Sequence, residues 1–204
     1  MSRLREKHKA DRDRRIIAAA STLFREAGYE RSNIEAIAAR AEVSIGTIYN
    51  YYQNKGDLLL AVVALEVNEV LNAGEGLIEH PPSEAAQAIG ALIATYLEHS
   101  LVYLSKEMWR HAMAISTQQP ESPSGRTYTD LDRRLADQVC RLIRRLQQGG
   151  GIDPRTEARS AGELIFNNTN MMFATFVKTE SMTVEELKEA IARQNAVLLA
   201  LIAR

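Results

Sequence analysis

The chain has 204 residues, 46% of them hydrophobic, and its 25 basic and 26 acidic side chains leave a formal net charge of −1. This length is ample for a hydrophobic core, but the net charge alone does not indicate a nucleic-acid partner. The one cysteine, Cys140, permits no internal disulfide, which is typical of a reducing cytoplasm. The N-terminus lacks the apolar region of a signal peptide, and the longest apolar run, 58–65, is far shorter than a membrane span. We therefore expect a cytoplasmic protein.

The charges are unevenly distributed along the chain. Residues 1–55 hold 11 Lys/Arg against 7 Asp/Glu, whereas the remaining residues hold 14 against 19. A basic first quarter followed by an acidic remainder is typical of a DNA-reading head with a separate regulatory part.

The first eight residues carry Arg3, Arg5 and Lys7 without apolar periodicity. They are compatible with a frayed terminus or with a basic arm that contacts phosphate or enters the minor groove of DNA. A first helix is then expected to run to about Glu26, and Gly28 is placed to end it in a left-handed conformation.

Residues 34–55 predict two short helices joined by a tight turn. In the first, the spacing of Ile34, Ile37 and Ala41 forms one apolar stripe. Ser32 and Glu35 have the S-x-x-E spacing of a capping box, so we expect Ser32 to begin this helix.

The second short helix, about 45–51, follows Ser44, which is a candidate N-cap. Its polar and aromatic side chains are Thr47, Tyr49, Asn50 and Tyr51. Hydroxyls, an amide and aromatic rings without carboxylates suit a helix that enters the major groove, because acidic groups would be repelled there. Two such helices joined by a short turn match the helix-turn-helix, whose second helix reads DNA.

The remaining sequence predicts further helices and no strand. Asn54 is the expected N-cap of a long fourth helix, and 80–83 is a Pro-containing break. Later helices are expected over about 84–101, 106–116 and 129–148, from Asp153 and Pro154 onward, and from a capping box at Thr183. A polar loop is expected at 117–126. The predicted fold is therefore all-α with about nine helices.

Residues from about Arg15 to Leu60 resemble the DNA-binding domain of the TetR family of bacterial transcriptional regulators. The most specific part is the sequence VSIGTIY at 43–49, followed by the aromatic Tyr52 and by KGDLL at 55–59. The resemblance implies a three-helix helix-turn-helix domain, which we place over 1–55 with the possible basic arm at 1–8 included, and a ligand-binding and dimerisation domain over 56–204. It also implies a helical bundle that forms a homodimer through its last two helices.

The two last helices are apolar on more than one face, which independently favours a surface buried by a second subunit. The alternative is that both helices bury these faces within one subunit. We favour the homodimer, because a helix-turn-helix that reads a two-fold site needs a partner.

The resemblance and the side-chain chemistry together predict the DNA contacts. Thr47 and Tyr49 are expected to hold phosphates, and Asn50 and Tyr51 to face base edges. The full set of predicted DNA-binding residues is Ser32, Ser44, Ile45, Thr47, Tyr49, Asn50, Tyr51 and Lys55. Tyr52 occupies the family's core aromatic position and is assigned to packing.

Two residues depart from the common family pattern. Glu42 stands where glycine is frequent in the turn, so either the turn does not need a positive φ or strain of ~1 kcal/mol is accepted there. Ile45 stands where a polar residue is common, and it could contact a thymine methyl group or read nothing. The operator sequence is therefore left open.

A one-component regulator also needs a ligand pocket. The candidates are aromatic, Met, His and Asn side chains of the later helices: Tyr96, His99, Tyr103, Met108, Trp109, Met113, Phe166, Asn167, Asn170 and Phe173. For most of them the alternative is ordinary core packing.

Three asparagines interrupt the apolar run of the eighth helix. A buried amide without a partner costs ~1–3 kcal/mol. We expect Asn168 to bond across a dimer, and Asn167 and Asn170 to line a cavity.

No pattern predicts a cofactor or a metal. Glu107 and His111 lie at i, i+4 and could share a metal ion, but a structural pair is favoured because no second carboxylate–histidine helix motif accompanies them.

The sequence thus predicts a homodimeric transcriptional repressor that a small hydrophobic or aromatic effector releases from a palindromic operator. The alternatives are a helical enzyme or small-molecule carrier that uses the body pocket, and an effector-independent DNA organiser. The enzyme is disfavoured, because the sequence has no nucleophile motif, paired metal-ligand helices or phosphate loop.

Overall fold

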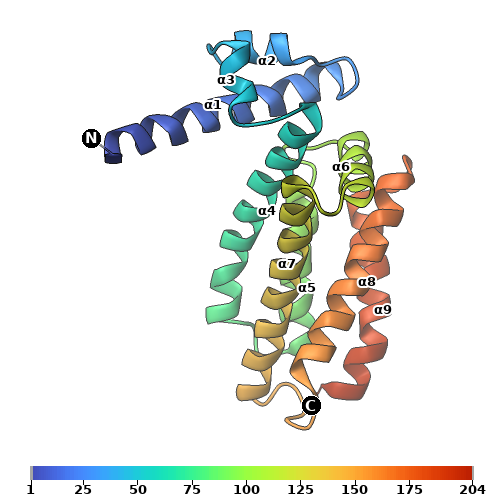
Figure 1. The fold of residues 1–204 in the computed structure, drawn as a ribbon. Helices are drawn as coiled ribbons and strands as arrows, with labels where there is room; N and C mark the ends of the chain where they lie inside the picture. Colours follow the sequence, from blue (N-terminus) through green and yellow to red (C-terminus); the bar gives the residue numbers. More distant parts are fainter. Residues whose placement is uncertain (1, 204) are drawn as a thin grey trace. The chain divides into compact units, whose positions relative to one another are not determined.

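The computed structural model describes residues 2–203, with the backbone alone described for residues 2–4. This part of the chain is all-α, as predicted, and its only bridge of the β type is an isolated one between Ile152 and Ala203 (Figure 1). The helices are α1 (Ser2–Ala27), α2 (Ile34–Arg40), α3 (Ile45–Tyr49), α4 (Lys55–Glu79), α5 (Ala85–His99), α6 (Lys106–Gln118), α7 (Pro123–Gln148), α8 (Ala158–Lys178) and α9 (Val184–Ile202). None of these described helices is long and apolar enough to cross a membrane.

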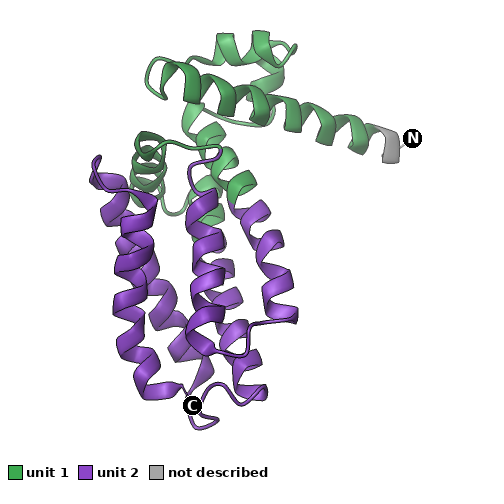
Figure 2. Ribbon diagram, turned by 180° about the vertical axis from the view of Figure 1, so that it is seen from behind, with its two compact units in different colours: residues 1–66, 103–129 green, residues 67–102, 130–204 purple. Residues whose placement is uncertain are grey.

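The chain forms two compact units, coloured separately in Figure 2. Unit 1 consists of residues 1–66 and 103–129, and unit 2 consists of residues 67–102 and 130–204. This division differs from the predicted boundary after residue 55, because a later segment, which contains α6, joins the N-terminal residues. Helices α4 and α7 each contribute residues to both units.

The head of unit 1 is built from α1, α2 and α3, whose apolar stripes include the buried side chains Ile16, Phe24, Ile37 and Ile48. As predicted, Gly28 ends α1 with a positive φ of 83°. The backbone N–H of Gly28 donates to the carbonyl of Phe24 at 3.0 Å.

The segment 103–129 of unit 1 packs on this head through polar and aromatic contacts. The His111 ring of α6 lies 4.6 Å from the ring of Tyr29, centroid to centroid. At the start of α7, the Ser124 hydroxyl donates to the Asp57 carboxylate at 2.5 Å. Helix α6 is therefore part of the same compact unit as the helix-turn-helix.

Three predicted helix boundaries were wrong. Helix α1 begins at Ser2, so residues 2–8 are helical rather than frayed. Helix α7 begins at Pro123, inside the predicted loop at 117–126. Helix α8 begins at Ala158 with Glu157 as its N-cap, so Asp153 and Pro154 do not start it. In contrast, the Thr183 capping box of α9 is confirmed.

Unit 2 is a bundle of α5, α8, α9 and the later parts of α4 and α7 (Figure 2). Leu92, Leu142, Phe176 and Leu187 are among its buried side chains. Helices α7 and α8 approach closely at Gly162, because a Cβ there would lie only 2.6 Å from the Cys140 sulfur. The close approach of α7 and α8 therefore requires a residue without a side chain at position 162.

Candidate functional site

Helix α3 presents a polar and aromatic surface over an apolar anchor. Ile48 is completely buried, whereas Ile45 is 41% exposed and Tyr49 is 53% exposed. Asn50, the C-cap, is also exposed. The sequence folds this way because Ile48 is the residue of this short helix that fits the head's core, and burying it turns its neighbours outward.

The predicted N-cap Ser44 is confirmed. Its hydroxyl accepts from the backbone N–H of Thr47 at 3.1 Å, and the hydroxyls of Ser44 and Thr47 are 2.8 Å apart. The two hydroxyls that we expected near phosphate thus form a pair at the exposed N-terminus of α3. A phosphate oxygen there could accept from this pair and from the first backbone N–H groups of the helix.

The turn before α3 accepts backbone strain at Glu42, whose φ is +53°. The sequence left two possibilities for this residue, and the positive φ selects the strained one. Strain of this kind costs on the order of 1 kcal/mol for a residue other than glycine.

Tyr51 does not point freely at DNA as expected. Its hydroxyl donates to the backbone carbonyl of Lys9 in α1 at 3.2 Å. The Lys9 ammonium lies 5.8 Å from the centroid of the Tyr51 ring. We therefore remove Tyr51 from the set of residues that face bases and regard it as a link between α1 and the end of α3.

Tyr52, which we assigned to packing, is half-buried and contacts α1. Its hydroxyl donates to the Asp13 carboxylate at 2.6 Å. Burial, together with this bond to Asp13, raises the pKa of Tyr52, so the phenol stays protonated.

Ser32 is not the N-cap of α2, because Asn33 holds that position and accepts from the backbone N–H of Ala36 at 2.8 Å. The Ser32 side chain is buried, and its hydroxyl lies 2.8 Å from the carbonyl of Gly28 and 3.2 Å from that of Leu23. This geometry makes Ser32 a tie between α1 and the following turn, and we leave it out of the proposed DNA surface.

Lys55 is similarly occupied within the head. Its ammonium donates to the carbonyls of Tyr29, Glu30 and Ser32 at 2.8, 3.1 and 3.1 Å. It also lies 4.4 Å from the centroid of the Tyr29 ring. An ammonium has three protons to donate, so Lys55 serves to hold the turn between α1 and α2 onto α4 rather than to grip phosphate.

The predicted ligand residues are divided between the two units. Tyr103, Met108, Trp109 and Met113 belong to unit 1, with Met108 and Trp109 buried in its core. The other six belong to unit 2, namely Tyr96, His99, Phe166, Asn167, Asn170 and Phe173.

Tyr96 takes part in a buried polar network of unit 2. Its hydroxyl donates to Gln138 at 2.7 Å, and the Gln138 amide donates to the carbonyl of Leu71 at 2.8 Å and to Glu75 at 2.7 Å. Arg141 also donates to Glu75, which lowers the pKa of that carboxyl. The network joins α4, α5 and α7 and satisfies the Tyr96 hydroxyl internally.

The three asparagines of α8 have different environments. The Asn168 amide donates to Asn195 of α9 at 3.0 Å, so it has a partner within the chain. Asn170 hydrogen-bonds Asp132 of α7. Burial raises the pKa of Asp132 to about 6, with the bond to Asn170 opposing the rise. Asn167 is exposed and therefore does not line an enclosed cavity within the subunit, contrary to our expectation.

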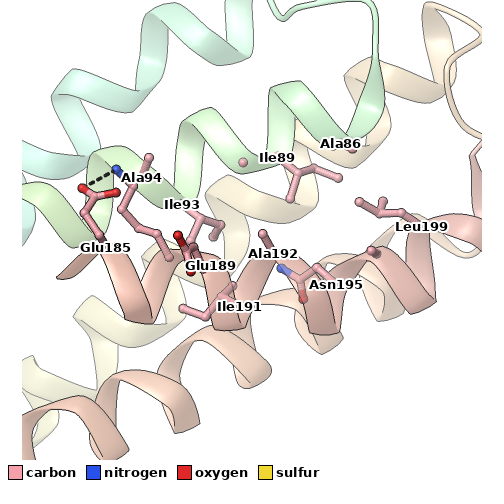
Figure 3. Close-up of a pocket in the computed structure, with 13 residues that line it drawn as sticks. Ala86, Ile89, Ile93, Ala94, Glu185, Glu189, Ile191, Ala192, Asn195 and Leu199 are labelled. Atoms are coloured by element: carbon pink, nitrogen blue, oxygen red, sulfur yellow. Dashed lines mark hydrogen bonds and ion pairs between the residues drawn. The ribbon is translucent and has the colours of Figure 1, made fainter. Parts of the chain in front are cut away.

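Unit 2 has an apolar groove of about 340 Å³ between α5 and α9 (Figure 3). Ile89 and Ile93 of α5 face Ile191 and Leu199 of α9 across it. Lys188 also lines the groove, and its ammonium donates to Glu98 and Glu185 at 2.6 and 3.1 Å. None of the residues that we predicted for ligand binding lines this groove.

Helices α8 and α9 also expose large apolar side chains. Leu164 and Met171 lie two turns apart on α8, and Met171 is 67% exposed. Val197 and Leu201 lie one turn apart on α9, and Leu201 is 79% exposed. Exposed apolar rows on two neighbouring helices are typical of a surface that another protein covers.

Among the side chains that the structure describes, no group of three His, Cys, Asp or Glu could hold a metal ion. Nε2 of His111 lies 3.8 Å from Oε1 of Glu107 and 3.5 Å from Oε1 of Glu30. These contacts connect α6 to the turn that follows α1.

Comparisons with known proteins match the head to a protein family. The family model described as bacterial regulatory proteins, tetR family, matches residues 16–62. The HTH-type transcriptional repressor KstR of Rhodococcus jostii (strain RHA1) is 34% identical over 79 residues, which cover 39% of this chain and 37% of KstR. The chain thus matches little more than a third of that relative's length.

Two further likenesses extend along nearly the whole chain. The fatty acid metabolism regulator protein of Bacillus subtilis (strain 168) is 24% identical over 197 residues, and the match covers 94% of each protein. The solved structure of Thermus thermophilus FadR, described as a TetR-family transcriptional repressor in complex with lauroyl-CoA, is similar with a TM-score of 0.65 at 20% identity. That match covers 92% of this chain and 93% of the other and supports the fold. These named relatives are regulators rather than enzymes.

Proposed function

Since the chain belongs to the TetR family of bacterial transcriptional regulators, we propose that it binds a palindromic operator as a homodimer and represses transcription until a small effector releases it. The observation that carries this proposal is the surface of α3, on which Ile45, Tyr49 and Asn50 are exposed above the buried Ile48. This surface has no carboxylate, so it can approach the phosphates of a major groove without repulsion.

The residues of α3 take different roles in this proposal. Thr47 and Tyr49 hold phosphates by their hydroxyls, with Ser44 beside Thr47, and these contacts set the register of the protein on DNA. Asn50 faces base edges, where its amide can pair with adenine through two hydrogen bonds. Ile45 offers an apolar tip to a thymine methyl group.

The proposed dimer uses α8 and α9. Leu164, Met171, Val197 and Leu201 supply the apolar surface, and the exposed Asn167 lies between the first two on α8. A dimer presents two copies of α3 to successive major grooves, whose half-sites are about 34–36 Å apart. An effector that shifts α4 by a few ångströms spoils this spacing, because α4 begins next to α3 in the chain and continues into unit 2.

The effector is proposed to be hydrophobic or aromatic. The apolar lining of the groove between α5 and α9 supports this class, as do relatives that are named for fatty acid metabolism or bound to lauroyl-CoA. The groove volume of about 340 Å³ lies at the lower end of the range of ligand pockets.

DNA recognition can be tested with duplexes that the parent protein selects from a random pool, and with DNA upstream of its own coding sequence. Asn50→Ala is expected to weaken binding by about 1–3 kcal/mol at one base position and to relax the preference there, whereas Tyr49→Phe weakens binding to all sequences alike. Gln87→Ala, an amide truncation at an exposed position of α5, is the matched control and leaves binding unchanged. Equal effects of the Tyr49 and Asn50 variants would contradict the assigned roles, and failure of the parent to select any sequence would contradict the proposed function.

The effector is tested by adding lauroyl-CoA to the operator complex. Release of DNA, together with weaker ligand binding in the presence of DNA, is expected because linkage is reciprocal. Gly90→Leu identifies the place of binding, since Gly90 lines the groove and an added Cβ meets no atom within 4 Å. If lauroyl-CoA no longer releases DNA from this variant, the ligand binds in the groove. If release is unchanged, the ligand binds elsewhere, and the predicted residues around Phe166 are the next candidates.

Two outcomes would favour the alternatives. A protein that binds the ligand but no specific DNA would be a carrier or an enzyme. A protein whose operator complex survives a panel of apolar ligands would be an effector-independent DNA organiser.

A further inference from the structure

Helix α1 is longer than the head requires. From residue 5 onward, where its side chains are described, the first buried side chain is Ile16, and residues 5–12 are exposed throughout. In both views this part of α1 extends past α2 and α3 (Figures 1 and 2). These residues, 5–12, which we call the extension of α1, therefore contribute little to the hydrophobic core of unit 1. Their helical form suggests a role other than core packing.

The extension is attached to the end of the reading helix at two points one turn apart. The Tyr51 hydroxyl donates to the backbone carbonyl of Lys9 at 3.2 Å, and the Tyr52 hydroxyl donates to the Asp13 carboxylate at 2.6 Å. Both tyrosines follow α3 directly, since α3 ends at Tyr49 and is capped by Asn50. The position of the extension is thus tied to that of the residues that read DNA.

Three cations lie along one stripe of this extension. Arg5, Lys9 and Arg12 have the spacing i, i+4, i+7, which brings them onto one face of a helix. Lys9 is the residue that Tyr51 contacts, and the Arg12 guanidinium bonds the carbonyl of His8 at 3.3 Å within the same stretch. We name this set the α1 basic stripe.

Two of the three acidic residues in this stretch have partners outside the stripe. Asp13 accepts the Tyr52 hydroxyl, and Asp11 lies 3.9 Å from Arg15 on the next turn. Residues 5–15 as a whole carry six Lys/Arg against three Asp/Glu. A surplus of positive charge therefore remains beside the end of α3.

We propose that the α1 basic stripe contacts DNA phosphates next to the bases read by α3, so that the extension forms a second, backbone-directed contact of each subunit. This inference rests on the proposed function. The contact is to the phosphate backbone and not to minor-groove bases, because a helix of about 10–12 Å diameter does not fit a groove about 6 Å wide. Phosphate contacts position a protein without reading sequence, which suits flexible Arg and Lys side chains.

The test compares two double variants of the full-length protein on a duplex that the parent has selected from a random pool. Arg5→Gln with Arg12→Gln neutralises the stripe, whereas Lys7→Gln with Arg14→Gln removes the same charge from exposed positions on the opposite face of the same helix. Glutamine is a good helix former, so both variants keep α1 helical, which circular dichroism verifies.

Binding is measured as a function of salt concentration. Each lost phosphate contact reduces the slope of log K against log[salt] by about 0.9, so two lost contacts make the stripe variant about 12-fold less sensitive between 50 and 200 mM salt. The opposite-face variant is expected to keep the parent slope. The base preference of both variants, and of Tyr51→Phe, stays that of the parent.

Equal slope changes in the two double variants would overturn the proposal, because they would reveal a general charge effect without a defined contact. Unchanged slopes in both would overturn it as well. A parent protein that selects no duplex would instead refute the proposed function, and this result is distinct from specific binding with an unaltered slope.

Discussion

Replacing Asp132 with asparagine is expected to stabilise the protein at neutral pH. Asp132 lies on α7 against Asn170 of α8, and burial raises the pKa of its carboxyl from 3.8 to about 6. Such a rise means that the folded protein holds the neutral form more tightly than the unfolded chain does. Ionisation of Asp132 at pH 7 therefore lowers the free energy of unfolding. A neutral amide of the same shape carries no charge and avoids this loss.

The magnitude follows from the two pKa values. A difference of about 2.2 pKa units corresponds to about 3 kcal/mol at 1.36 kcal/mol per unit, and solvent around the half-buried carboxyl makes this an upper bound. Below pH 3.8 the carboxyl is protonated in both states, so parent and variant are equally stable. As the pH rises from about 3.8 to about 6, the unfolded chain ionises before the folded protein does, so the parent loses stability relative to Asp132→Asn, and the difference stays constant at higher pH.

Urea unfolding at a single protein concentration, repeated between pH 3.5 and pH 7.5, measures this difference. Asp130→Asn is the control, since Asp130 lies on the same helix with a more exposed carboxylate paired to Arg133. That substitution should change the free energy of unfolding by no more than about 1 kcal/mol. An Asp132→Asn variant that is no more stable than the parent at pH 7, or whose advantage persists at pH 3.5, would refute the reasoning.

Three further outcomes are expected. Glu42→Gly should raise the free energy of unfolding by up to about 1 kcal/mol, because it relieves the positive φ of 53°, and thermal unfolding that shows a loss would contradict this. Gly162→Ala should lower the free energy of unfolding by about 1–3 kcal/mol, because its Cβ would lie 2.6 Å from the sulfur and 2.7 Å from the Cα of Cys140. An unchanged urea midpoint would show that α7 and α8 can separate freely. Leu201→Asp should shift the proposed dimer towards monomer in sedimentation equilibrium without unfolding the protein, because the side chain is 79% exposed in the single chain, and an unaltered mass would argue against α9 in the proposed interface.

The head was the most predictable part of the structure. Ser44 and Thr183 were predicted as N-caps from spacing alone, and both accept the expected backbone N–H groups. Caps of this kind depend on residues three positions apart, so the information lies within one turn. The same local reasoning was wrong at Ser32, because the adjacent Asn33 competes for the cap and the turn buries the serine hydroxyl.

The partners of the candidate functional residues were much less predictable. Lys55 was expected at a phosphate, yet its ammonium bonds three carbonyls of the turn after α1, more than 20 positions away in the chain. Tyr51 was expected at base edges, yet it bonds Lys9 across 42 positions. A pattern identifies residues that are able to donate or pack, but it does not contain the distances between helices that decide which partner is reached first.

The sequence by itself determined the all-α fold, the helix-turn-helix and the family of the head. The spacing of apolar residues, the helix caps and the family-specific motif that indicate them are all local properties of the chain. Only the tertiary structure decided that α6 joins the head, that the α1 basic stripe is tied to α3, and that Gln138 satisfies the Tyr96 hydroxyl. These outcomes depend on which helix faces meet, and that choice is made by the burial of apolar surface over the whole chain.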